Sequence, residues 1–140
     1  MSEGNTYRKL AAIMAADVVS YSKLMSKNEE ETLQLLKEVN EGIIRPKVAD
    51  HGGRMFKTLG DGFLAEFPSI IGATTCALSI QECIFALDPE DSDRKVLKFR
   101  IGVHSGDVIV SDDDVYGDGV NTAARLEEIC EPNCVVVSER

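Results

Sequence analysis

The sequence has 140 residues, 44% of them apolar, and carries a formal net charge of −9. Its length fits one domain that is large enough to bury a hydrophobic core. The acidic balance argues against a nucleic-acid-binding protein, which needs a basic surface to replace phosphate counterions. The longest apolar run spans residues 10–16, whereas a membrane-spanning helix needs about 20 apolar residues. We therefore expect no membrane segment in this chain.

The first part of the chain predicts a strand followed by a helix. Residues 8–19 form an apolar run that we interpret as the first strand. Asn28, with Glu31 three residues later, is typical of a capping box and predicts the start of a helix. Apolar residues then repeat at helical spacing. Pro46 is expected to kink this helix, and the His-Gly-Gly sequence at residues 51–53 ends it.

A hairpin and a second helix follow. Residues 54–59 and 63–67 are strand-like, and the Gly-Asp-Gly sequence around Asp61 predicts the turn between them. Ser69 is expected to cap a second helix, whose apolar residues form one buried stripe. Residues 88–95 are charged and predict a solvated loop.

The four cysteines are expected to be free thiols. They form no CxxC motif, and the chain has only two histidines, so a zinc site is not expected. Cys76 and Cys83 are seven residues apart, which places them on the apolar face of the second helix, where free cysteines are readily buried. Because unpaired cysteines are the rule in reducing compartments, we expect an intracellular, cytoplasmic protein. We expect the two histidines, His51 and His104, to be ordinary surface residues.

The last third of the chain completes the predicted fold. Strands are predicted over residues 99–103 and 108–110, separated by a turn at residues 104–106. A helix is predicted from Gly117 to about Cys130, and a last strand over residues 135–137. The first four strands and two helices follow the order β-α-β-β-α-β, which is ferredoxin-like. We therefore predict a single α+β domain over residues 1–140, with a ferredoxin-like core and an additional strand and helix.

Two acidic residues stand at the ends of predicted strands. Asp17 ends the first strand, and Asp61 lies at the tip of the hairpin. We expect the first strand to lie beside the first strand of the hairpin, which lets the two carboxylates converge at one edge of the sheet. Convergent carboxylates bind hard cations such as Mg²⁺, and two such ions can assist phosphoryl transfer. For each residue alone, an ordinary turn or strand end is the alternative interpretation.

Asn121 and Arg125 are four residues apart and therefore share one face of the predicted last helix. An amide and a guanidinium presented together suit a sugar oxygen and a phosphate. Two polar residues on a solvated helix surface are the alternative.

Three segments, in this order, together resemble the catalytic domain of class III nucleotide cyclases, most closely a bacterial group: LAAIMAADVVSYSKLM, HGGRMFKTLGDGFLAEFPS and DDVYGDGVNTAARLEEICEP. The resemblance extends from about Arg8 to Ser138. It implies an adenylate cyclase that converts ATP to 3′,5′-cyclic AMP and pyrophosphate. It also implies a homodimer in which both subunits contribute to each site.

The resemblance assigns roles to individual residues. Asp17, Asp61 and the Val18 carbonyl of one subunit would hold two divalent cations, Mg²⁺ or Mn²⁺. The other subunit would supply Asn121 to orient the ribose and Arg125 to meet the charge that develops on the α-phosphate. The triphosphate would be approached by the backbone of five consecutive residues: Val18, Val19, Ser20, Tyr21 and Ser22.

The choice of base would depend on Lys57 and Asp114, which the other subunit would also supply. Adenine presents an acceptor at N1 and a donor at N6, which fit a lysine and an aspartate. Guanylate-forming members of the family typically have a glutamate and a cysteine at these positions, so ATP is favoured over GTP. Asp112 and Asp113 are neighbouring candidates for the second position, and the seven-residue spacing to Asn121 supports Asp114.

Domains of the family usually continue past the strand at residues 135–137 into a hairpin that commonly carries a triphosphate-binding lysine. The resemblance therefore implies a domain that is incomplete at its C-terminus. Two alternatives stay open, a guanylate or dual-specificity cyclase and a catalytically inactive nucleotide-binding or dimerisation module. The presence of all the matching polar residues weighs against the second.

Overall fold

The structure, a computed structural model, describes residues 6–87 and 97–138. Six strands form one sheet in the order β2-β3-β1-β4-β5, and β6 pairs with β4 on the same side as β5. The predicted loop at residues 88–95 lies outside the described residues. The elements are β1 (Thr6–Val18), α1 (Tyr21–Lys27), α2 (Glu29–Val39), η1 (Asn40–Ile44), α3 (Arg45–Asp50), β2 (Arg54–Leu59), β3 (Gly62–Phe67), α4 (Ile70–Ala86), β4 (Phe99–Ser111), β5 (Asp114–Tyr116), α5 (Asp118–Glu128) and β6 (Val135–Val137).

The sheet confirms the ferredoxin-like α+β fold and corrects one neighbour relationship. β1 pairs antiparallel with β3, the second strand of the hairpin, and not with β2 as we expected. β3 alternates half-buried and buried residues, whereas β2 is mostly exposed. The more apolar strand therefore takes the interior position, and β2 forms the edge of the sheet.

β4 is one continuous strand, so the prediction of two strands around a turn at residues 104–106 was wrong. It pairs with β1 without interruption, from Val18 opposite Phe99 to Thr6 opposite Ser111. The long ladder offered by β1 overrides the local turn signal of the Ser-Gly pair. His104 consequently lies within the strand, half-buried, with Nδ1 2.7 Å from the Ser138 hydroxyl oxygen, and burial lowers its pKa. Our expectation of a surface turn residue was therefore wrong.

The helix that follows β1 is divided into several parts. α1 is a short helix that we did not predict. α2 begins as predicted, because the Asn28 side chain accepts a hydrogen bond from the Glu31 amide at 3.0 Å. Before Pro46 the helix widens into the π-helical turn η1 and resumes as α3. Proline lacks an amide hydrogen and its ring crowds the preceding turn, which explains the irregularity at this place.

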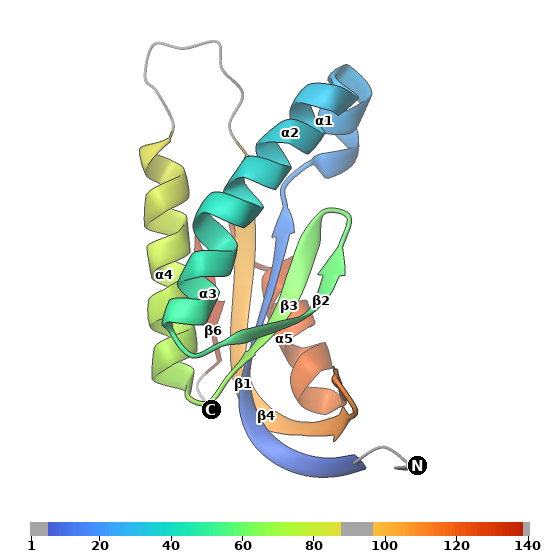
Figure 1. Cartoon of the computed structure of the whole chain (residues 1–140), viewed down its shortest axis with the longest axis vertical. Helices are drawn as coiled ribbons and strands as arrows, with labels where there is room; N and C mark the ends of the chain where they lie inside the picture. The colour runs from blue at the N-terminus through green and yellow to red at the C-terminus, as the bar shows by residue number, and fades with distance from the viewer. Residues whose placement is uncertain (1–5, 88–96, 139–140) are drawn as a thin grey trace.

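The helices cover both faces of the sheet (Figure 1). α2, η1, α3 and α4 bury one face of β1, represented by Met14 and Ala16, together with Cys76 of α4. α5 packs on the other face, against Ile13 and Ala15 of β1.

All four cysteines are free, and burial raises the pKa of Cys76 to about 11. None of the helices in residues 6–87 and 97–138 has the length and apolar character needed to cross a membrane.

Candidate nucleotide and metal site

The structure brings Asp17 and Asp61 together where β1 ends. Asp17 lies opposite Gly62 in the β1–β3 ladder, and the Val18 amide donates a hydrogen bond of 2.7 Å to the Asp61 carbonyl oxygen. A side chain on Gly62 would collide with the Ala16 carbonyl, so glycine permits this close approach of the hairpin to β1. Asp17, near the end of β1, and Asp61, in the turn between β2 and β3, therefore share one end of the sheet.

Asp17 has a cationic partner that we did not anticipate from the sequence. Arg100 of β4 lies directly opposite Asp17, with its Nε 3.3 Å from Oδ1. About a quarter of the Asp17 side chain and a third of the Arg100 side chain are exposed to solvent. Because ion pairs in contact with water contribute little free energy, this one can be exchanged for another cation at modest cost.

Glu127 of α5 adds a third carboxylate to this corner. Gly102 of β4 lets α5 approach closely, because a Cβ at Gly102 would collide with the Glu127 backbone amide. The Glu127 side chain is buried, and its Oε2 lies 3.8 Å from Arg100 Nε and has no hydrogen-bond partner among the described residues. Burial and the neighbouring Asp17 charge raise the pKa of Glu127 to about 7.

Within residues 6–87 and 97–138, no three His, Cys, Asp or Glu side chains are arranged as a metal-binding group, so a divalent cation here would also need backbone or phosphate oxygens as ligands. Asp17 and Glu127 supply negative charge, and Arg100 is the one cation among the described residues that is ion-paired with them. An unpartnered buried carboxylate oxygen is the kind of group that a cation or an ordered water stabilises. Oxygen donors with excess negative charge are what Mg²⁺ and Mn²⁺ prefer.

The turn after β1 leads from the carboxylates into α1. The Val19 amide donates to the Lys98 carbonyl at 2.8 Å, which fixes the turn to the start of β4. Ser20 has a left-handed backbone with φ 56°, an uncommon conformation for a residue with a side chain. The Tyr21 hydroxyl reaches toward Gly60 in the hairpin turn. Residues 18–22 therefore form a compact bend beside the Asp17–Asp61 junction.

Lys57 and Asp114 lie on β2 and β5. Lys57 is exposed, and its amine forms no hydrogen bond or ion pair within the described part of the chain. The Asp114 carboxylate accepts a hydrogen bond from the Val115 amide at 2.9 Å. A hydrogen bond to Asp114 also raises the pKa of the Tyr116 hydroxyl. The Asp114 side chain is thus oriented by its own strand.

Asn121 and Arg125 share one face of α5, as the spacing predicted, and both are exposed on it. The opposite face of the helix, with Val120, Ala123 and Glu127, packs on the sheet. Across residues 6–87 and 97–138, neither exposed side chain bonds to another group. Within one chain these two residues therefore form no hydrogen bond or ion pair with the Asp17–Asp61 junction, and they are available to a partner surface.

Sequence reasoning missed Arg100 and Glu127. Each carries a charge at a position where its element packs against the rest of the fold: Arg100 stands between buried Phe99 and Ile101, and Glu127 lies on the packed face of α5. A charged residue that interrupts an apolar pattern was the sequence signal that could have identified both residues.

Comparison with known proteins gives consistent matches. The sequence model of the family described as the adenylate and guanylate cyclase catalytic domain matches residues 5–140. A putative adenylate cyclase 3 of Rhizobium meliloti is 41% identical over 99% of this chain, and an adenylate cyclase of Streptomyces coelicolor is 34% identical over 90%. This chain spans only 24% and 32% of the lengths of those two relatives.

Solved structures resemble the chain in fold. The crystal structure of an adenylate/guanylate cyclase/hydrolase from Silicibacter pomeroyi superposes with a TM-score of 0.89 at 41% identity, covering 96% of this chain and 78% of the other. The adenylyl cyclase CyaB from P. aeruginosa superposes with a TM-score of 0.85 at 20% identity, covering 96% and 79%. The second match concerns the fold alone.

Proposed function

Because this chain belongs to the family of adenylate and guanylate cyclase catalytic domains, we propose that it forms cyclic AMP and pyrophosphate from ATP as a homodimer. The observation that supports the proposal most strongly is that the candidate polar residues lie in two separate places within one chain. Asp17 and Asp61 meet at one end of the sheet, whereas Asn121 and Arg125 face outward from α5 without partners in the described part of the chain. A second subunit lets the two sets meet.

Asp17, Asp61 and the Val18 carbonyl would hold two divalent cations, Mg²⁺ or Mn²⁺. When bound, such ions lower the pKa of the ribose 3′-hydroxyl and neutralise phosphate charge. Arg100 pairs with Asp17 in the structure, so it sits where it can keep a positive charge beside the phosphates once Asp17 is engaged. The bend formed by Val18, Val19, Ser20, Tyr21 and Ser22 adjoins this place and would contact the triphosphate.

The partner's α5 would complete the site. In the reaction the 3′-oxygen bonds to the α-phosphorus, the bond from that phosphorus to the bridging oxygen breaks, and the hydroxyl proton leaves to solvent. Asn121 would orient the ribose for this attack, and Arg125 would stabilise the charge on the α-phosphate. Because that contact is strongest in the transition state, Arg125→Ala should lower kcat roughly 10²- to 10³-fold.

Lys57 and Asp114 would select the base. A lysine amine donates to adenine N1, and an aspartate carboxylate accepts from the adenine N6 amino group. The Asp114 carboxylate is oriented by the Val115 amide, which supports a fixed acceptor at this position. Guanine presents the reverse arrangement along this edge, with an acceptor at O6 and a donor at N1.

The test is to identify the product by mass spectrometry after incubating the purified protein with ATP or GTP and Mn²⁺. We expect cyclic AMP from ATP and little cyclic GMP from GTP. Asp61→Ala should abolish the product, whereas Asp50→Ala, which removes an exposed carboxylate on α3, should not. Cyclic GMP as the main product would overturn the base assignment. An unaffected Asp61→Ala variant would overturn the site.

A further inference from the structure

One side chain joins the two edges of the sheet. Arg54 lies on β2, at one edge, and its Nη1 donates a hydrogen bond of 3.0 Å to the carbonyl oxygen of Asp113, in the turn before β5 at the other edge. The curvature of β1 and β4 at this end of the molecule brings the edges together (Figure 1). A contact between residues 59 positions apart therefore closes one end of the sheet.

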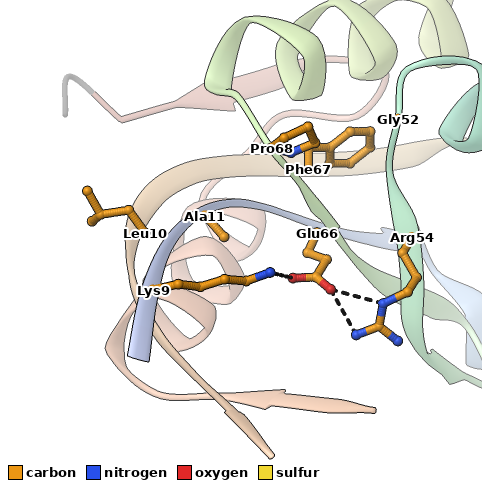
Figure 2. A pocket seen from close by; sticks show the side chains of 8 residues that line it. All are labelled: Lys9, Leu10, Ala11, Gly52, Arg54, Glu66, Phe67 and Pro68. Atoms are coloured by element: carbon orange, nitrogen blue, oxygen red, sulfur yellow. Dashed lines mark hydrogen bonds and ion pairs between the residues drawn. The ribbon is translucent and has the colours of Figure 1, made fainter. Parts of the chain in front are cut away.

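Glu66 fixes the Arg54 guanidinium. It lies opposite Arg54 in the hairpin, and its Oε1 accepts a hydrogen bond from Arg54 Nε at 2.9 Å and lies 2.8 Å from Arg54 Nη2. Its other oxygen lies 3.1 Å from Lys9 Nζ of β1. Figure 2 shows this row of charges along a cavity of about 260 Å³ that Gly52 and Pro68 also line.

The Glu66 side chain is only 12% exposed, so its charge depends on both cations. Nε and Nη2 of the guanidinium share one oxygen of Glu66, Oε1, which restricts the orientation of the planar group. The third nitrogen, Nη1, is thereby directed at the Asp113 carbonyl oxygen.

The turn that Arg54 holds carries Asp114. Asp112 in this turn has a left-handed backbone with φ 57°, which costs free energy in a residue with a side chain. The Asp114 carboxylate follows directly and is oriented by the Val115 amide. The turn between β4 and β5 is exposed to solvent. The hydrogen bond from Arg54 attaches this turn to β2. A shift of the turn would move Asp114.

The strand that Arg54 holds carries Lys57, three residues further along β2. We propose that Arg54, fixed by Glu66, is a positioning residue that sets the placement of Asp114 relative to Lys57 and thereby the preference for ATP over GTP. This inference rests on the proposed function, in which Lys57 and Asp114 contact the base. Arg54 itself does not touch the substrate.

The test compares Arg54→Lys and Glu66→Gln with the wild type. Lysine at position 54 keeps the positive charge but lacks the several nitrogen donors of the guanidinium. Glutamine at position 66 keeps the shape of the side chain but weakens the ion pairs with Arg54 and Lys9. We expect each variant to raise KM for ATP and to lower the ratio of ATP to GTP specificity constants, both roughly tenfold, with kcat for ATP within about threefold. Amide hydrogen exchange at residues 111–116 should accelerate. Arg45→Lys, a substitution of an exposed arginine on α3, is the matched control and should change none of these.

The outcomes separate this inference from the proposed function. Absence of cyclic nucleotide from the wild type overturns the proposed function, and with it the inference. A wild type that makes cyclic AMP, with Arg54→Lys and Glu66→Gln of unchanged selectivity, overturns the inference alone. Equal losses of activity with ATP and GTP, accompanied by a lower Tm, would show a purely structural role and also overturn it. Because two conservative variants are compared, the nucleotide selectivity can still be measured when one of them folds poorly.

Discussion

Asp17 and Arg100 face each other across the β1–β4 ladder, with the guanidinium Nε 3.3 Å from a carboxylate oxygen. The arginine therefore occupies the electrostatic position that a divalent cation would take beside Asp17. The Asp17 charge also raises the pKa of Glu127, so Arg100 offsets negative charge at this corner. If Asp17 binds a divalent cation as proposed, the cation and Arg100 compete for the same carboxylate.

This competition predicts the behaviour of Arg100→Gln. Removing the positive charge should tighten the binding of Mn²⁺ in the absence of nucleotide by roughly three- to tenfold, because repulsion between the ion and the guanidinium is lost. Isothermal titration calorimetry of the nucleotide-free protein measures this, with Arg45→Gln as the control at an exposed site. Unchanged or weaker Mn²⁺ binding in Arg100→Gln would contradict the proposed cation site at Asp17.

Glu127 predicts a pH dependence of stability. Its pKa is raised to about 7 in the folded protein from 4.5, so folding favours the neutral acid. The stabilisation that Glu127 contributes as the neutral acid is complete below about pH 4.5 and is lost as the pH rises through 7. In buffer with a metal chelator, the free energy of unfolding of the wild type relative to Glu127→Gln should fall by up to about 3 kcal/mol across this range.

Urea denaturation at pH 5 and pH 8 tests this prediction. Glu128→Gln, at the exposed neighbouring position, should keep the pH slope of the wild type. The prediction fails if Glu127→Gln keeps that slope as well, because the buried carboxyl group would then not be the source of the pH dependence.

The base assignment predicts a change of substrate. Replacing Lys57 with glutamate and Asp114 with cysteine installs the pair typical of guanylate-forming relatives. The double variant should lower the ATP to GTP ratio of specificity constants at least roughly 10²-fold, because each base then meets mismatched hydrogen-bonding groups. Steady-state kinetics with both nucleotides measure the ratio. A double variant that still prefers ATP would show that other residues select the base.

The features that sequence analysis predicted well are those set by local chemistry. Asn28 and Ser69 cap their helices through their own side chains, and the turn at Asp61 joins two strands of the expected lengths. The shared face of Asn121 and Arg125 on α5 follows from helical spacing alone. Each of these signals lies within a few residues of the structure that it specifies.

The errors concern contacts between distant segments. The turn predicted at residues 104–106 is absent because the partner strand β1 is long enough to pair through it. The position of β3 beside β1 and the pairing of Asp17 with Arg100 depend on how the strands assemble. The hydrogen bond from Arg54 to Asp113 depends on the curvature of the whole sheet. No short window of sequence contains this information.

The central claim is a cyclase site that two identical subunits share, and complementation tests it most directly. Under the proposed function, Asp61→Ala would lack a cation ligand and Arg125→Ala would lack the transition-state contact, so each variant alone should form almost no cyclic AMP. In an equal mixture, half of the dimers are mixed, and each of these has one intact site. The mixture should therefore recover about a quarter of the wild-type rate. A mixture that stays inactive, although mixed dimers form, would contradict a shared site.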